Sequence, residues 1–266
     1  MLWTLLAAAA VLYLACAAIL YAAQRRMLFV PDTARPVLAG AGAPGLREVT
    51  LQTADGLALL AWYLPPPEGR PILVYFHGNA GSLANRGPRI RRFAAAGWGV
   101  LMTEYRGYGG NPGAPSEAGF ALDARAAIAF LDAQPGPRPQ RLVYGESIGT
   151  GVAVRVASET PIDALILESP YTSIADIARR RFRIFPVDLL LRDPFDSLSR
   201  IGQVQAPILI LQGLQDGIVP PDLGQALYRA APDPKQLWQA PEAGHNDLMQ
   251  HGAAEATIDF VRRLDH

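Results

Sequence analysis

The sequence predicts an α/β fold whose mostly parallel, doubly wound sheet follows a single hydrophobic N-terminal helix. From residue 71 onward, apolar runs typical of buried strands alternate with stretches of helical spacing, and strands that alternate with helices pair in parallel. Before them, strand-like runs at 46–53 and 57–64 are separated only by Ala-Asp-Gly, which predicts a leading antiparallel hairpin. The 266 residues, 50% of them hydrophobic, suffice for one large domain with a substantial core.

The first 25 residues are expected to form a transmembrane anchor. Residues 2–23 carry no charged side chain, and at about 1.5 Å per residue such a helix is long enough to cross a bilayer. A cleaved signal peptide is the alternative, but it would show a basic start and a shorter apolar core. Arg25 and Arg26 follow the apolar stretch, so the positive-inside rule favours a cytoplasmic location for the rest of the chain.

Residues 26–45 separate the anchor from the folded part of the chain. They are rich in proline, glycine and alanine and show no apolar periodicity, which is typical of a tether. The globular domain is therefore expected over residues 46–266.

After the hairpin, strands and helices are predicted in alternation. The strand at 71–76 is apolar without interruption, as expected for a strand covered on both faces, and it runs into His-Gly-Asn-Ala-Gly. The same reasoning predicts, in order, a helix at 84–96, a strand at 98–104, a helix at 117–133, a strand at 141–144, a helix reaching 158, strands at 164–168 and 207–212, a helix at 221–231, a strand at 236–240 and a closing helix at 247–264.

The interval 171–206 breaks this rhythm, because it is longer than an ordinary connection through one helix. We expect it to be an inserted cap. It contains four arginines among Phe and Ile within residues 179–185. Such a charge run is usually a solvated helix face. Beside a membrane anchor, the same composition also suits an interfacial surface that holds acidic headgroups and acyl chains.

The junction of strand 141–144 with the next helix has the pattern Gly-x-Ser-x-Gly, with Ser147 at its centre. This is typical of a nucleophile elbow, in which a strained turn exposes a serine hydroxyl and flanking small residues let the strand and helix backbones pass closely. Gly145 and Gly149 supply that clearance. Ser147 would also lie at a helix N-terminus, where backbone N–H groups favour a developing oxyanion.

The charge and cysteine content exclude several classes of function. The 24 basic and 24 acidic residues cancel, so no long-range field would gather nucleic acid, and we expect no nucleic-acid partner. Cys16 is the single cysteine and allows no internal disulfide. No Cys/His cluster offers the ligands of a structural zinc site. We therefore expect neither a metal nor a cofactor.

Two further residues complete a catalytic triad with Ser147. Asp216 follows the strand at 207–212, and His245 follows the strand at 236–240. His245 would take the proton of the serine hydroxyl during attack, while Asp216 fixes the imidazole tautomer and stabilises the imidazolium. Glu168 ends the strand before that of Asp216 and is the alternative acid. The remaining histidines compete poorly with His245: His77 lies in the loop after the strand at 71–76, His251 lies in the closing helix, and His266 ends the chain.

The chain resembles the α/β-hydrolase superfamily, and within it the membrane-anchored Bem46/ABHD13/ABHD17-like branch, with a serine aminopeptidase S33-like hydrolase domain. The order Ser, acid, His along the chain is that of the superfamily. The resemblance covers about residues 46–264. Besides Ser147, Asp216 and His245, its motifs are His-Gly-Asn-Ala-Gly at 77–81, Glu-Tyr-Arg-Gly-Tyr-Gly at 104–109 and Glu-Ser-Pro-Tyr at 168–171. Many relatives have Asp where this chain has Glu104, a departure in a supporting position.

The oxyanion hole is expected to combine two backbone N–H groups. One belongs to Ile148, the residue after the nucleophile, and the other to the loop after the third strand. The resemblance implies Asn79 for the second. Since backbone donors cannot be identified from side chains, Gly78 and Ala80 remain alternatives. The sequence indicates no specific substrate-binding side chains.

These observations lead us to expect a membrane-tethered serine hydrolase. It would cleave carboxylic esters or thioesters, with lipophilic acyl groups as the expected substrates, through an acyl-enzyme. An aminopeptidase-like amide hydrolase is an alternative, because the same triad serves both substrate classes. A non-catalytic membrane-bound binding module on the same fold is a second alternative, which the intact set of Ser147, Asp216 and His245 argues against.

Overall fold

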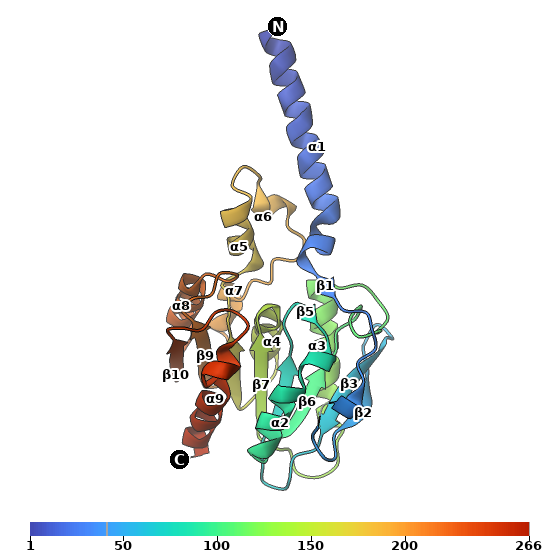
Figure 1. Cartoon of the computed structure of the whole chain (residues 1–266), viewed down its shortest axis with the longest axis vertical. Coiled ribbons are helices and arrows are strands. Elements are labelled where there is room, and N and C mark those ends of the chain that lie inside the picture. The colour runs from blue at the N-terminus through green and yellow to red at the C-terminus, as the bar shows by residue number, and fades with distance from the viewer. Residues whose placement is uncertain (41, 266) are drawn as a thin grey trace.

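The computed structural model describes residues 1–40 and 42–265 (Figure 1). Ala41, within the expected tether, and His266, at the end of the expected domain, lie outside the described residues. A long helix, α1 (Leu2–Leu28), extends away from a layered α/β body. The body is built on an eight-stranded sheet with the strand order β10-β9-β8-β7-β4-β6-β3-β2.

The sheet is parallel except at the edge that its first two strands form. The pairs β2·β3 and β3·β6 are antiparallel, and every other pair is parallel. The predicted fold class, including the leading hairpin, is confirmed. The strands are β2 (Arg47–Gln52), β3 (Ala58–Leu64), β4 (Ile72–Phe76), β6 (Gly99–Thr103), β7 (Arg141–Glu146), β8 (Ala164–Glu168), β9 (Ile208–Gly213) and β10 (Lys235–Ala240).

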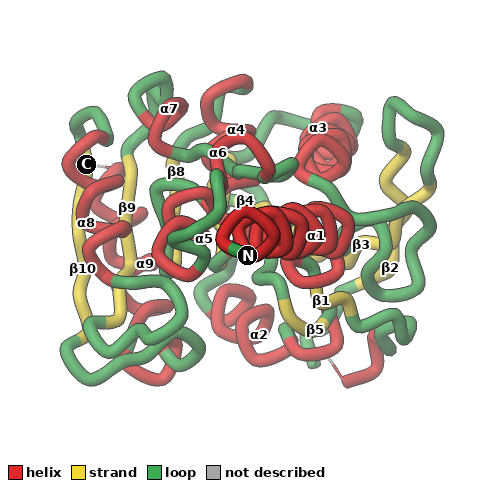
Figure 2. The backbone as a smooth tube through the Cα atoms, turned by 90° about the horizontal axis from the view of Figure 1, so that it is seen from above, coloured by secondary structure: helices red, strands yellow, loops and turns green. Residues whose placement is uncertain are grey.

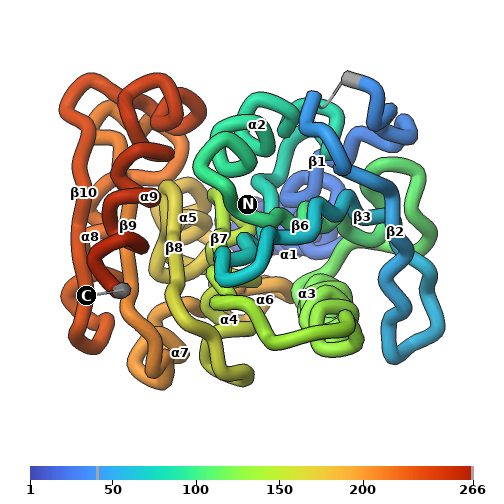
Figure 3. The backbone as a smooth tube through the Cα atoms, turned by 90° about the horizontal axis from the view of Figure 1, so that it is seen from below, coloured from blue at the N-terminus to red at the C-terminus, as the bar shows by residue number. Residues whose placement is uncertain are grey.

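Helices cover both faces of this sheet, as Figures 2 and 3 show from above and below. Along β4, Leu73 and Tyr75 join one buried cluster, whereas Ile72, Val74 and Phe76 join the other, as the two-residue period of a strand requires. The helices that pack on the Val74 face are α3 (Glu117–Asp132), α4 (Ile148–Glu159), α7 (Leu198–Ile201) and α8 (Pro221–Ala230). Those on the Leu73 face are α2 (Gly87–Ala95) and α9 (Ala253–Arg262).

The closing helix differs from its prediction. Instead of one helix over 247–264, the chain forms a 3-10 turn, η3 (Leu248–His251), and then α9. Gly252 separates them with φ of 99°, a left-handed conformation that an α-helix cannot contain and that glycine adopts at little cost. His251 therefore lies in the turn and not in the closing helix.

The interval expected as a tether contains regular structure. α1 continues to Leu28, and β1 (Val30–Pro31) pairs in parallel with β5 (Ala80–Gly81). Phe29, which lies between α1 and β1, is buried and packs its ring against Phe120 and Phe195. The first residues of the interval 26–45 are thus docked on the body, while η1 (Leu38–Gly40) precedes the hairpin.

Part of the expected cap stands above the carboxyl ends of the parallel strands. The helices α5 (Ile174–Arg181) and α6 (Val187–Leu190) lie there beside α1, whereas α7 returns to the body and packs near α4 and α8 (Figures 1 and 2). We call residues 174–192 the cap from here on.

α1 is the one helix in the described part of the chain that is long and apolar enough to span a membrane. Its most apolar window has a mean hydropathy of 2.3, and none of its residues is buried. A long helix with an exposed apolar surface needs an apolar environment, which supports the expected membrane anchor.

Candidate active site

Ser147 stands at the junction of β7 and α4 in a strained conformation. Its φ and ψ are 51° and −118°, outside the regions that non-glycine residues ordinarily occupy. The flanking glycines make the turn sterically feasible, as predicted. A Cβ atom on Gly145 would lie 2.5 Å from the carbonyl oxygen of Gly149, and a Cβ on Gly149 would lie 2.1 Å from that of Phe76. Both positions therefore require glycine.

The structure brings Ser147, His245 and Asp216 together from three separate loops. The Oγ atom of Ser147 lies 2.9 Å from Nε2 of His245, and Nδ1 of the same ring lies 2.7 Å from Oδ2 of Asp216. The other oxygen of Asp216, Oδ1, accepts hydrogen bonds from the backbone N–H groups of Ile218 and Val219. The carboxylate is thereby fixed with one oxygen facing the imidazole.

This arrangement determines which proton transfers are feasible. A carboxylate beside Nδ1 favours the tautomer that carries its proton there, and Nε2 is then an acceptor directed at the serine hydroxyl. The side chain of His245 is 8% exposed and that of Asp216 is fully buried. The low exposure strengthens the interaction between the carboxylate and an imidazolium. The geometry can therefore activate a hydroxyl nucleophile.

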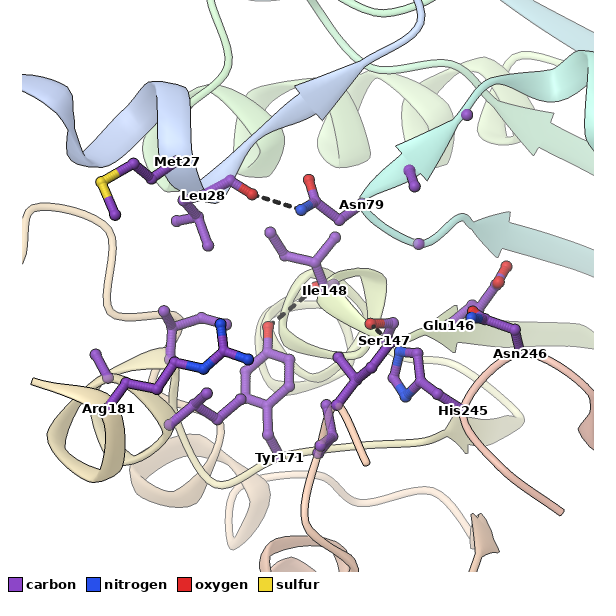
Figure 4. Close-up of a pocket in the computed structure, with 18 of the residues that line it drawn as sticks. Met27, Leu28, Asn79, Glu146, Ser147, Ile148, Tyr171, Arg181, His245 and Asn246 are labelled. Carbon is purple, nitrogen blue, oxygen red and sulfur yellow. Dashed lines mark hydrogen bonds between the residues drawn. The ribbon is translucent and has the colours of Figure 1, made fainter. Parts of the chain in front are cut away.

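The candidate oxyanion donors occupy two elements next to Ser147. Ile148 is the first residue of α4, where a backbone N–H has no acceptor within the helix. Asn79 lies in the loop between β4 and β5, and the preceding Gly78 is so close that a Cβ there would be 3.5 Å from that of Ser147. Both predicted residues therefore adjoin the nucleophile (Figure 4).

The side chain of Asn79 has a role that the sequence did not indicate. Its amide Nδ2 donates to the carbonyl oxygen of Leu28 at 2.5 Å, and its Oδ1 accepts from the N–H of Val30 and the hydroxyl of Tyr108. Asn79 thus joins the end of α1 to the active-site loop. An anchor and a loop about fifty residues apart in sequence share no local pattern that would predict this contact.

Two buried residues, His77 and Glu104, support the loop that contains Asn79. Nε2 of His77 lies 2.8 Å from Oε1 of Glu104, and both side chains are completely buried. The second oxygen of Glu104 accepts from the N–H of Leu83 at 2.8 Å. Glu104 therefore supports the loop, in agreement with its expected supporting position.

Glu168, the alternative triad acid, is directed at other partners. Its buried carboxylate accepts two hydrogen bonds from the guanidinium of Arg89, at 2.5 and 2.9 Å, and one from the hydroxyl of Tyr144 at 2.5 Å. A bidentate pair with arginine satisfies both carboxylate oxygens. Glu168 is therefore bonded to an arginine and a tyrosine and does not contact His245.

Glu146, which precedes the nucleophile, belongs to the same charged cluster. Its carboxylate accepts from the hydroxyl of Tyr75 at 2.5 Å and lies 3.3 Å from Nε of Arg86 and 3.6 Å from Nη2 of Arg89. Burial alone would raise the pKa of Glu146, but the two arginines and the Tyr75 hydrogen bond outweigh it, so the pKa is lowered to about 2. Glu146 is therefore ionised at neutral pH.

A large cavity lies above Ser147. Its volume is about 1020 Å³, and Ser147 and His245 form part of its floor (Figure 4). The walls come from the loops around Asn79, Asn246 and Val219, the start of α2, the cap, and the last turns of α1. The cap contributes mainly apolar side chains, among them Ile174, Ile177, Phe182, Phe185 and Leu190. The sequence predicts the cap but gives no sign that α1 contributes to the cavity.

No group of three or more potential metal ligands occurs among the described residues.

Comparisons with known proteins identify the family of this chain. A family model described as serine aminopeptidase, S33, matches residues 67–190. An uncharacterised protein of Mycobacterium tuberculosis is 39% identical over 246 residues, which cover 91% of this chain and 86% of that protein. Protein bem46 of Schizosaccharomyces pombe is 33% identical over 232 residues, covering 82% of this chain and 77% of bem46. Lysophosphatidylserine lipase ABHD12 of Rattus norvegicus is 36% identical over 181 residues, covering 60% of this chain and 45% of the lipase.

Solved structures share the fold at lower identity. An esterase of Pyrococcus furiosus superimposes with a TM-score of 0.73 at 19% identity, covering 89% of this chain and 98% of the esterase. Its sheet and helices match the body described above, and at this identity the likeness concerns the fold alone. With an identity of 33% across more than two thirds of bem46, and with this fold, the chain belongs to the α/β-hydrolase superfamily, in its Bem46/ABHD-like branch.

Proposed function

We propose that this protein is a membrane-tethered serine hydrolase that cleaves carboxylic esters or thioesters of lipophilic acyl groups. The observation that carries the proposal is the hydrogen-bonded series from Ser147 through His245 to Asp216 at the floor of a large, mainly apolar cavity. A nucleophile within 3 Å of a base, and that base within 3 Å of an orienting acid, form the recurring unit of acyl transfer.

The reaction would proceed through an acyl-enzyme. Oγ of Ser147 attacks the ester carbonyl carbon while its proton passes to Nε2 of His245, and Asp216 stabilises the imidazolium. The N–H groups of Ile148 and Asn79 would bind the oxyanion of the tetrahedral intermediate. Collapse of the intermediate breaks the bond to the alcohol or thiol, which takes the proton from His245. Water, deprotonated by His245, then releases the acid and regenerates Ser147.

The cavity supports a lipophilic acyl group. Its cap wall is formed mainly by aliphatic and phenyl side chains, and its volume is at the upper end of the range of about 300–1,000 Å³ that small-molecule sites occupy. The relatives support the same class, since they include a lipase named for lysophosphatidylserine and, by fold alone, esterases. The location next to α1 supports a substrate that resides in the membrane, with the body on the cytoplasmic face as the positive-inside rule favours.

The description of the matching family model favours an aminopeptidase-like activity as a second candidate. An aminopeptidase binds the α-ammonium group of its substrate, which calls for a carboxylate that faces the site. Among the described residues that line the cavity, Glu146 is the one with a carboxyl group, and Arg86 and Arg89 already pair with it. The charge balance of the cavity therefore favours an ester or thioester over a peptide.

Replacement of the nucleophile tests the proposal. The full-length chain should react with a fluorophosphonate probe and hydrolyse p-nitrophenyl esters, with rates that rise from acetate to octanoate. Ser147→Ala should abolish labelling and lower turnover by several orders of magnitude, because nucleophile and base act as one unit. Folding should be retained, since only a hydroxyl is removed, and circular dichroism checks this. Undiminished turnover by Ser147→Ala would end the assignment.

A further inference from the structure

One wall of the cavity above Ser147 is formed by the membrane anchor itself. Five residues in the last turns of α1 line the cavity: Leu20, Tyr21, Gln24, Met27 and Leu28. Their spacing places them on a single stripe of the helix. The cap faces this stripe across the cavity with Phe182, Phe185 and Leu190. The space between anchor and cap is therefore continuous with the site of Ser147 (Figure 4).

Polar contacts give this wall a defined position. The guanidinium of Arg25 donates two hydrogen bonds to the carboxylate of Asp193, at 2.7 and 3.1 Å, and the Asp193 side chain is only 3% exposed. The amide of the preceding residue, Gln24, donates to the carbonyl oxygen of Leu190 and accepts from the N–H of Arg192. These contacts join α1 to the end of the cap, so the anchor is a fixed part of the site.

The cap also contacts α1 far from the body. The ring of Tyr13 stacks on that of Phe185 with 5.2 Å between centroids, and its hydroxyl donates to the carbonyl oxygen of Ile184. At about 1.5 Å per residue, Tyr13 lies about 18 Å along the helix from Arg25, deep within the apolar stretch. The neighbouring Ile184 and Leu189 are 74% and 84% exposed. Exposed apolar side chains of the cap therefore lie at the level of the apolar stretch of α1, next to the exposed charged residues Arg183 and Asp188.

We propose that this stripe of α1 is part of the acyl-chain subsite, and that a lipid ester reaches Ser147 directly from the bilayer by passing between α1 and the cap. This rests on the proposed hydrolase function. The acyl chain would then remain in apolar surroundings along its whole path, which avoids the cost of exposing it to water. The polar end of the substrate would stay near the interface, where Arg181 lines the cavity.

Filling the subsite tests the proposal. Leu20→Trp places a large ring in the stripe, and Ile19→Trp is the matched control, because Ile19 lies at the same depth, is 66% exposed and does not line the cavity. Both full-length variants and the wild type are compared in phosphatidylcholine vesicles with p-nitrophenyl butyrate and dodecanoate. We expect Leu20→Trp to lower the dodecanoate-to-butyrate ratio of kcat/KM by about tenfold, and Ile19→Trp to change it by less than about twofold.

A second measurement uses the wild-type chain and does not depend on a variant folding. A fluorophosphonate whose dodecyl chain ends in a diazirine first reacts with Ser147, and irradiation then attaches the chain end to its neighbours. Attachment to residues 13–28 of α1 supports the subsite, whereas attachment confined to other peptides overturns it.

The outcomes separate the two proposals. If the wild type neither labels nor hydrolyses either ester, the proposed function fails. If the chain labels but the dodecanoate-to-butyrate ratio is the same in all three proteins, the hydrolase stands and the α1 subsite is wrong.

Discussion

At the scale of single residues, two carboxylates at the ends of adjacent strands differ in their partners. Asp216 faces His245, while Glu168 is bonded to Arg89 and Tyr144. We expect Asp216→Asn to lower kcat by on the order of 10⁴, because the amide leaves the imidazole in the wrong tautomer. Glu168→Gln should mainly reduce stability, because the guanidinium of Arg89 loses its bidentate charged partner and keeps only the longer contact with Glu146. Ester turnover at pH 7 to 8 and thermal unfolding of both variants check this.

The reverse result would reassign the acid. If Glu168→Gln were inactive but stable while Asp216→Asn kept its turnover, the bidentate pair would serve catalysis and the Asp216 contact would be structural.

Glu146 provides a prediction about pH. Because its pKa in the folded protein is lowered to about 2, below the value of about 4.3 in an unfolded chain, its contribution to stability is complete above the unfolded value and is lost as the pH falls toward 2. Glu146→Gln lacks this contribution. The difference in Tm between wild type and Glu146→Gln should therefore be largest near neutral pH and narrow below about pH 4. A difference that stays constant from pH 7 to pH 3 would contradict it.

The sequence predicted that the three candidate triad residues meet, but it did not predict the charged cluster beside them. Ser147, Asp216 and His245 each follow a strand, and parallel strands bring such residues to one edge of the sheet. Arg89 instead lies in a helical stretch of ordinary composition, where nothing marks one arginine as buried. Its role depends on the packing of α2 beside β7 and β8, a tertiary relation without a local signal.

At the scale of elements, the contact between α1 and the body can be tested with neighbouring arginines. Arg25→Ala removes the charged partner of the buried Asp193 and should lower the free energy of unfolding by about 1–3 kcal/mol. Arg26 is exposed and has no ion-pair partner among the described residues, so Arg26→Ala should change the free energy of unfolding by less than about 0.5 kcal/mol. Thermal unfolding in detergent compares them, and equal effects of the two substitutions would show that the Arg25 pair contributes nothing.

The strands and helices of the body were predictable because their periodicity is strong. Most of their ends fall within a residue or two of the prediction, as for α3 and β8. The exceptions are elements that depend on distant contacts. The pair β1·β5 has only two residues in each strand, too few for a pattern, and Asn79 brings the chain together there. The end of η3 was not predicted either, because it depends on the single residue Gly252 within a stretch whose spacing is otherwise helical.

At the scale of the whole molecule, we expect α1 to span the membrane with the body on the cytoplasmic side. The protein should stay in the membrane fraction after carbonate extraction, because about 20 apolar residues suffice for a span. In spheroplasts, externally added protease should leave the body intact. Release by carbonate would show a cleaved or peripheral segment, and digestion from outside would reverse the orientation.

Asp193 is bonded to the anchor on one side and to the start of α3 on the other, since it also accepts from the N–H of Glu117 at 2.9 Å. A helix on a flexible linker can tilt alone when its apolar length differs from the thickness of the bilayer. α1 has no such freedom at its lower end, so a thinner membrane would tilt the body together with the helix and bring the tip of the cap to a different depth among the lipids. The thickness of the membrane would then influence which part of a lipid lies opposite Ser147.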